Sequence, residues 1–137
     1  VNNINDAAII YQNKSNDTKE KSFATVALKG DATNSNAIGA RMLLFTKDGL
    51  RTYEHNPVHG FLSSMQVPMH IGFHQTTVDS ALLIWPDNSY EKVQLQQNTL
   101  NKFTYRKGLP LFDYSIIHQW NQNRFAVTDQ TTATAFS

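Results

Sequence analysis

Short segments of alternating or β-branched apolar residues, separated by turn residues, run through most of this chain. No window of about a dozen residues carries apolar side chains at helical spacing, whereas Gly, Asn, Asp and Pro recur at short intervals. This punctuation is typical of sheets whose strands are joined by tight turns. It predicts an all-β fold of about seven or eight strands, arranged as an antiparallel β-sandwich or as a barrel-like variant of one.

The expected strands alternate with clear turn signals. They lie at residues 23–28, 38–46, 50–55, 79–85, 90–95 and 100–105. Asp48 and Gly49 predict a hairpin between the second and third of them, because both residues tolerate positive φ. Asn88 predicts another between the fourth and fifth, since asparagine can take the left-handed conformation that a turn requires. Residues 56–67, interrupted by Pro57 and Gly60, predict a long loop with a short extended piece at residues 61–63.

Large apolar side chains on these strands define the expected core. The candidates are Phe45, Phe73, Leu82, Ile84, Trp85, Val93 and Phe103, and Val26 and Leu28 are also expected to face inward. The strand at 79–85 is apolar on both faces. It is therefore expected to be central in its sheet, or to pack its outer face on another part of the protein.

Composition disfavours several classes of protein. With 137 residues, of which 40% are hydrophobic and 17% charged, the chain fits one domain with a sizeable core. The formal net charge of +1 provides no strong field for nucleic acid or an anionic membrane. There is no cysteine, and no apolar run approaches the roughly 20 residues that would span a bilayer.

A series of short motifs carries a family resemblance. In order, they are Asn36 to Arg41, Gly60 to Ser64, His70 to Phe73, Val78 to Ser80, and Leu83 to Pro86. At this spacing they resemble the ASPIC/UnbV domain, over about residues 23 to 106. Two departures are His74, where the family tends to have glycine after Gly72-Phe73, and Asn88, where it tends to have glycine after Trp-Pro-x.

The resemblance implies a context. Such modules are usually found after FG-GAP or VCBS-type β-propeller repeats in large secreted or cell-surface proteins. We therefore expect residues 1–22 to be the end of a preceding propeller and a linker, 23–108 to be the β-sandwich, and 109–137 to be an inter-domain segment. The implied location is extracellular or in the cell envelope of a bacterium, and the implied partners are adjacent propellers of the parent chain.

Histidine pairs raise a metal hypothesis that their surroundings disfavour. His55 with His59, and His70 with His74, have the i, i+4 spacing that binds zinc on a helix. Neither segment has a helical pattern, and on a strand four residues span about 13 Å. No metal and no cofactor are expected.

Arg41 lies in an apolar strand, where a guanidinium needs a partner. Asp79 is the expected carboxylate, forming an ion pair that fixes two strands or docks the module, with recognition of a ligand carboxylate or phosphate as the alternative. Gly39, Trp85 and Pro86 are expected, with Asp79, to have structural roles.

Aromatic side chains provide the other candidate binding residues. Tyr53, Phe61, Tyr90 and Trp120, together with Arg41, form the proposed binding set, because a sugar ring can stack on an aromatic face. For Trp120 the favoured interpretation is that it anchors the C-terminal segment to the sandwich.

Two further site hypotheses are disfavoured. Asp48 and Asp87 lie in turns without the alternating carboxylates of a calcium loop. Ser63 and Ser64 lack the Gly-x-Ser-x-Gly turn of a nucleophile. Neither segment supplies catalytic chemistry.

The leading interpretation is a non-catalytic module of a large exported bacterial protein, for glycan or protein recognition and packing on an adjacent β-propeller. The alternative is an accessory domain whose loop at 56–67 contributes to a carbohydrate-active enzyme site on that propeller. Nucleic-acid binding is a remote third possibility.

Overall fold

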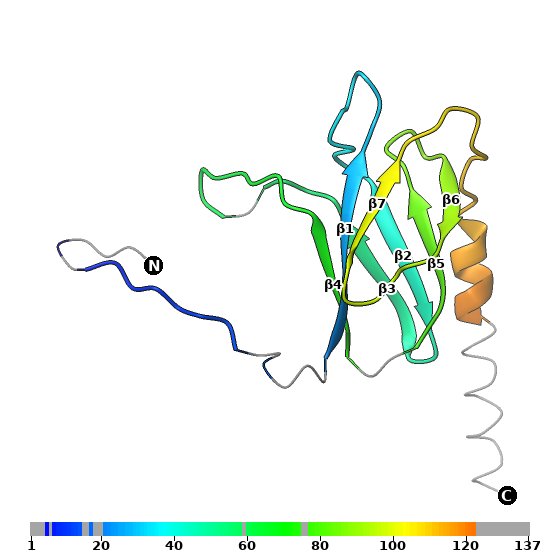
Figure 1. The fold of residues 1–137 in the computed structure, drawn as a ribbon. Helices are drawn as coiled ribbons and strands as arrows, with labels where there is room; N and C mark the ends of the chain where they lie inside the picture. Colours follow the sequence, from blue (N-terminus) through cyan, green and yellow to red (C-terminus); the bar gives the residue numbers. More distant parts are fainter. Residues whose placement is uncertain are drawn as a thin grey trace, which may run out of the picture.

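A computed structural model describes residues 5, 7–14, 17, 21–58, 60–74 and 77–122, with the side chain of His74 excepted. Seven strands form two facing sheets (Figure 1). They are β1 (Ser22–Lys29), β2 (Arg41–Thr46), β3 (Gly49–Glu54), β4 (Met69–His74), β5 (Val78–Ile84), β6 (Tyr90–Val93) and β7 (Leu100–Thr104). No helix in this described part of the chain has the length and apolar character needed to cross a bilayer.

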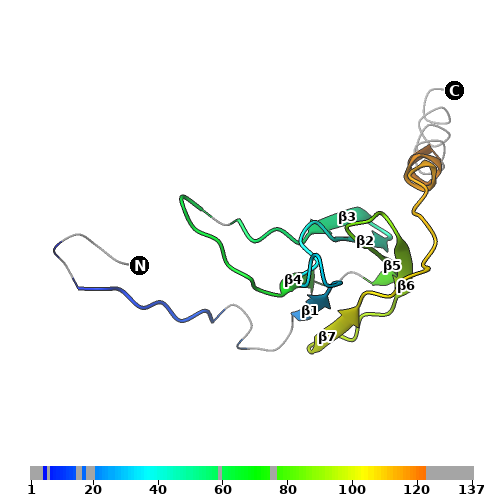
Figure 2. The ribbon, with the colours of Figure 1, turned by 90° about the horizontal axis from the view of Figure 1, so that it is seen from above.

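The two sheets confirm the predicted β-sandwich. One has the order β4-β1-β7 and the other the order β3-β2-β5-β6. Seen from above, they form two layers that do not close into a barrel (Figure 2). All pairings are antiparallel except that of β1 with β7, which is parallel.

The main core lies between the layers. Its largest fully buried side chains include Trp85, Met42, Leu44, Ile71 and Leu83. Of the predicted core residues, Phe45, Phe73, Ile84, Trp85 and Val93 are buried, and Leu82 and Phe103 are half-buried. Val26 is fully buried, and Leu28 packs against the core as a half-buried side chain.

Both predicted hairpins are present. β2 and β3 pair with Thr46 opposite Gly49, and Asn88 has φ of 67° in the turn between β5 and β6. The predicted strand at 38–46 was too long at its beginning, because Ala37 (φ 51°) and Gly39 (φ 90°) bend the chain before Arg41. The sequence pattern also missed β4, which pairs with β1 through the His70 motif.

The outer face of β5 is covered by residues 109–122, which we call the C-terminal strap. A second apolar cluster forms there from Leu43, Phe45 and Ile84 of the sheet and Phe112 of the strap. β5 is therefore both central in its sheet and packed on its outer face, as its two apolar faces predicted.

Residues 115–122 of the strap are helical, which the sequence pattern missed (Figure 1). Asp113 caps the beginning of this helix: its Oδ1 accepts from the Ser115 amide (2.9 Å) and its Oδ2 from the Ser115 hydroxyl (2.7 Å). Ile117 and Trp120, three residues apart, face the sheet. The rest of the predicted inter-domain segment, residues 123–137, lies outside the described residues.

Candidate functional site

The loop at residues 56–67, which we call the arm, carries a group of exposed apolar side chains. Phe61 and Leu62 at its tip are each 91% exposed, and Val58, Met65 and Val67 are also exposed. The arm carries no Asp, Glu, Lys or Arg. Exposed apolar side chains grouped in this way are typical of contact surfaces.

Hydrogen bonds give the arm a defined shape. The Val58 amide donates to Asn56 Oδ1 (3.0 Å), and the Met65 amide donates to the Pro57 carbonyl (2.8 Å). Val58 and Ser64 form a single antiparallel bridge. The extended piece predicted at residues 61–63 is wrong, because Leu62 has φ of 50° and the tip is a turn.

The arm leaves the sandwich between β3 and β4 and projects on the same side as residues 7–14 (Figures 1 and 2). Residues 7–14 are in no strand, and Ile10 is 94% exposed. Hollows of about 300 Å³ and about 180 Å³ lie at the base of the arm and share His55, Val67 and Pro68. This side of the molecule therefore combines two exposed apolar segments with concave surface.

The predicted binding residues do not form one platform. Tyr53 is half-buried on β3 against the main core, whereas Phe61 is at the tip of the arm. Tyr90 lies on the opposite side, beneath the strap, and Trp120 belongs to the strap itself. Tyr90 contacts Phe112 edge-on at 5.4 Å, and Trp120 contacts Phe45 at 5.7 Å. Trp120 thus anchors the C-terminal segment, as the favoured interpretation of this residue predicted.

The expected ion pair between Arg41 and Asp79 is wrong. In the antiparallel register of β2 with β5, Arg41 lies opposite Ile84. Asp79 comes just before Ser80, which pairs with Phe45. Arg41 and Asp79 therefore lie at opposite ends of the two paired strands. Arg41 instead donates from Nη1 to the Tyr114 hydroxyl (3.1 Å), and its guanidinium lies 6.0 Å from the Tyr114 ring centroid. The guanidinium was correctly expected to need a partner, but the partner is in the strap.

The residues assigned structural roles occupy distinct places. Gly39 has a positive φ, and its amide donates to the His55 carbonyl (2.9 Å). Trp85 is 1% exposed and donates from Nε1 to Glu91 Oε1 (3.1 Å). Pro86 is exposed in the turn after β5, and Asp79 is exposed near the start of β5.

A further hollow lies at the end of the sandwich, and sequence reasoning missed it. Its volume is about 250 Å³. We call it the end pocket; it is lined by Gly30, Asp31, Thr33, Asn34, Trp85, Pro86, Asp87 and Tyr105. These residues come from the β1–β2 loop, the β5–β6 turn and the chain just after β7, so only the fold brings them together.

Both carboxylates of the end pocket are held in the ionised form. The hydroxyl of Thr33 and the amides of Asn34 and Thr33 donate to Oδ1 of Asp31, and these bonds hold its pKa below the ordinary value. For Asp87, desolvation opposes ionisation, but bonds from the Ser89 and Tyr105 hydroxyls and the Ser89 amide outweigh it and lower the pKa.

The same network affects Tyr105. Its hydroxyl donates to Asp87 Oδ2 at 2.7 Å, and this bond, with desolvation and the charges of Asp87 and Asp31, raises the pKa of Tyr105. Asp87 is therefore a turn residue, as expected, that also orients an aromatic side chain. Asp48 is likewise in a turn, between β2 and β3.

Among the described residues, no group of three or more His, Asp or Glu side chains could hold a metal ion. His70 stacks on Phe23 with ring centroids 5.0 Å apart and lies 3.3 Å from the Thr25 hydroxyl. His59 and the His74 side chain lie outside the described residues. The backbone of His74, where the family tends to have glycine, ends β4 opposite Ser22.

Comparison with known proteins gives one finding. No curated protein matches the chain significantly. A profile of the family described as ASPIC and UnbV matches residues 30–107, which include the two diagnostic motifs from Ile38 to Arg41 and from Val78 to Pro86. This match covers more than half of the sequence, and the chain belongs to the ASPIC and UnbV family.

Proposed function

We propose that this chain is a non-catalytic recognition and packing module of a larger exported protein, and that the arm is its contact surface for an adjacent domain. The observation that carries the proposal is the exposure of Phe61 and Leu62, at 91% each, on a loop held in shape at its stem. Burying each of these side chains stabilises a complex by about 1.5–3 kcal/mol.

The partner surface is inferred from the chemistry of the arm. Because residues 56–67 carry no Asp, Glu, Lys or Arg, the arm matches an apolar, uncharged recess better than a charged one. The family resemblance favours a β-propeller of the same parent chain as the owner of that recess. Residues 7–14 extend on the same side and expose Ile10 and Tyr11, so they are suited to join that neighbour.

The same resemblance supports a proposal for the location of the protein. ASPIC/UnbV modules are usually found in secreted or cell-surface proteins, which supports an extracellular or cell-envelope location. The competing function is an accessory wall of a carbohydrate-active site, with the arm and the hollows at its base facing a sugar chain.

The double variant Phe61→Ser with Leu62→Ser tests the packing role. In the intact parent protein we expect the thermal unfolding midpoint to fall by several degrees, since apolar contacts with the neighbour are lost. In the isolated 137-residue chain the same variant should leave the midpoint unchanged. Leu111→Ser, at a strap residue that is 71% exposed, is the matched control.

Two results would contradict the proposal. One is a parent whose stability does not respond to the double variant. The other is cleavage of polysaccharides by the parent that disappears when residues 56–67 are deleted, which would favour the accessory-enzyme function.

A further inference from the structure

The end pocket is separate from the arm and has its own chemistry. Its lining shares no residue with the hollows at the base of the arm. At about 250 Å³ it has room for one long side chain, not for an extended oligosaccharide. Trp85, Pro86 and Tyr105 provide apolar walls, and Asp31 and Asp87 bring carboxylates from two different loops.

We propose that the end pocket receives the side chain of an arginine from a partner polypeptide. A guanidinium is planar and weakly hydrated, and its five donors suit a site with two separate carboxylates. The aliphatic part of the side chain matches the apolar walls at Pro86 and Tyr105.

The two carboxylates are placed to accept hydrogen bonds from a ligand. Within the described residues, every hydrogen bond to Asp31 uses Oδ1, so Oδ2 remains for a ligand. Asp87 is fixed by Ser89 and by the Tyr105 hydroxyl, so its position does not depend on the ligand. A site whose acceptors are already oriented loses little entropy when it binds.

The aromatic geometry disfavours a sugar in this pocket. Stacking of a pyranose needs an exposed aromatic face, but Trp85 is only 1% exposed. Its ring contacts Tyr105 edge-on at 5.5 Å, and its Nε1 already donates to Glu91.

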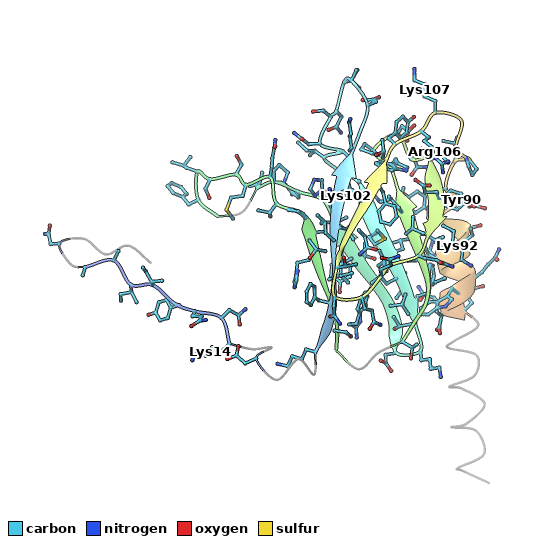
Figure 3. The ribbon with its side chains drawn as sticks, viewed as in Figure 1. Lys14, Tyr90, Lys92, Lys102, Arg106 and Lys107 are labelled. Atoms are coloured by element: carbon cyan, nitrogen blue, oxygen red, sulfur yellow. The ribbon has the colours of Figure 1, made fainter. Side chains whose placement is uncertain are left out.

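Two cations of the chain lie close to this end of the sandwich (Figure 3). Arg106 is paired with Glu91 through Nη2 and Oε2 at 3.0 Å. Lys107 acts on Asp31 through its charge and helps to lower the pKa of that carboxyl, after the hydrogen bonds from Thr33 and Asn34. The positive charge of Lys107 opposes an incoming cation through space, so we expect its removal to strengthen binding.

The test is an NMR titration of the 137-residue chain with the peptide acetyl-Gly-Arg-Gly-amide. We expect saturable shifts of the amides of Asp31, Asp87 and Tyr105, with a Kd on the order of 1 mM. Asp31→Asn and Asp87→Asn should each weaken binding about three- to tenfold, and Lys107→Gln should tighten it. Asp79→Asn, an exposed carboxylate near the other end of β5, should change nothing.

Several outcomes would overturn the assignment. One is that acetyl-Gly-Gln-Gly-amide binds as tightly as the arginine peptide, or that acetyl-Gly-Lys-Gly-amide binds as tightly or more tightly. Another is that methyl α-glucoside shifts these amides and the arginine peptide does not. A third is that Asp79→Asn weakens binding as much as Asp31→Asn does. Unfolding midpoints of all variants show whether a loss is one of folding. Because the arm is not involved, Phe61→Ser with Leu62→Ser should bind the arginine peptide normally even if the proposed packing role is correct.

Discussion

At Gly30 a single hydrogen atom in place of a side chain lets the β1–β2 loop close. A Cβ there would lie 1.9 Å from the Asn34 carbonyl oxygen and 3.0 Å from the Ala37 nitrogen. Both are backbone atoms in a loop held by hydrogen bonds, including Gly30 amide to Ser35 carbonyl at 2.9 Å. The loop therefore has to move if the residue gains a methyl group.

We predict that Gly30→Ala lowers the free energy of unfolding by about 1–3 kcal/mol in chemical denaturation. Gly72→Ala is the matched control, because a Cβ at Gly72 on β4 meets nothing within 4 Å. Its free energy of unfolding should be unchanged or slightly higher. Equal effects of the two substitutions would contradict the loop geometry.

Asp87 links stability to pH. Since its pKa is lower in the folded chain than in the unfolded one, its contribution is present above about pH 4, the unfolded value, and is lost as pH falls through the folded pKa. We predict that Asp87→Asn reduces the loss of stability between pH 5 and pH 2 by under about 1 kcal/mol. The measurement is urea unfolding across this range, and an unchanged pH profile would contradict the hydrogen-bond network.

Among the elements, the strap is the one whose removal should change the behaviour of the module most. Residues 110–112 run alongside the β5–β6 turn and are hydrogen-bonded to it. The Tyr90 amide donates to the Pro110 carbonyl, and the Phe112 amide donates to the Asn88 carbonyl, both at 2.9 Å. The Tyr114 hydroxyl adds a bond to Asn88 Oδ1 (2.8 Å). Asn88 therefore does more than tolerate a positive φ, because its side chain fastens the strap where the family tends to have glycine.

We predict that Phe112→Ala costs about 3 kcal/mol or more, because this 4% exposed ring fills the cluster between strap and sheet. Leu111→Ala, at the exposed neighbour, should cost under about 0.5 kcal/mol. Both values come from chemical denaturation. A small effect of Phe112→Ala would show that the strap is not part of the cooperative unit.

Truncation after residue 108 carries a different expectation. It would uncover Leu43, Phe45 and Ile84 on the outer sheet face. We predict that the truncated chain self-associates at concentrations where the full chain is monodisperse in analytical ultracentrifugation. A shortened chain with the sedimentation behaviour of the full one would contradict the covering role of the strap.

The elements show what the sequence could and could not predict. Alternating apolar residues and the turns at Asp48-Gly49 and Asn88 predicted the hairpins, because these are local signals. β4 was missed because Gly72 and the histidines weaken its apolar pattern, although pairing with β1 stabilises it. The strap helix was missed because the local marks in its described residues are few: Asp113 with Ser115 at its beginning, followed by Ile117 and Trp120.

The candidate sites depended on long-range placement. The prediction of an Arg41–Asp79 ion pair was wrong because the register of β2 with β5 decides which residues of the two strands lie opposite each other, and residue type alone does not reveal that register. The end pocket could not be predicted because Asp31, Asp87 and Tyr105 converge from three separate connections. The exposure of Phe61, in contrast, agrees with its place in a segment broken by Pro57 and Gly60.

The whole molecule is a sandwich with two separate regions for which we propose contacts with partners. The arm and residues 7–14 extend from one side, and the end pocket opens between the loops at one end. The strap covers the outer face of β3-β2-β5-β6 (Figure 2). Such a distribution suits a module that joins neighbours on more than one side.

The central claim is that the arm is buried against a neighbouring domain of the parent protein. Amide hydrogen exchange of residues 60–67 tests it most directly, compared between the intact parent and the isolated 137-residue chain. We predict at least tenfold slower exchange in the parent, with unchanged exchange in the core strand β2. Equal exchange of these amides in both proteins would contradict the claim.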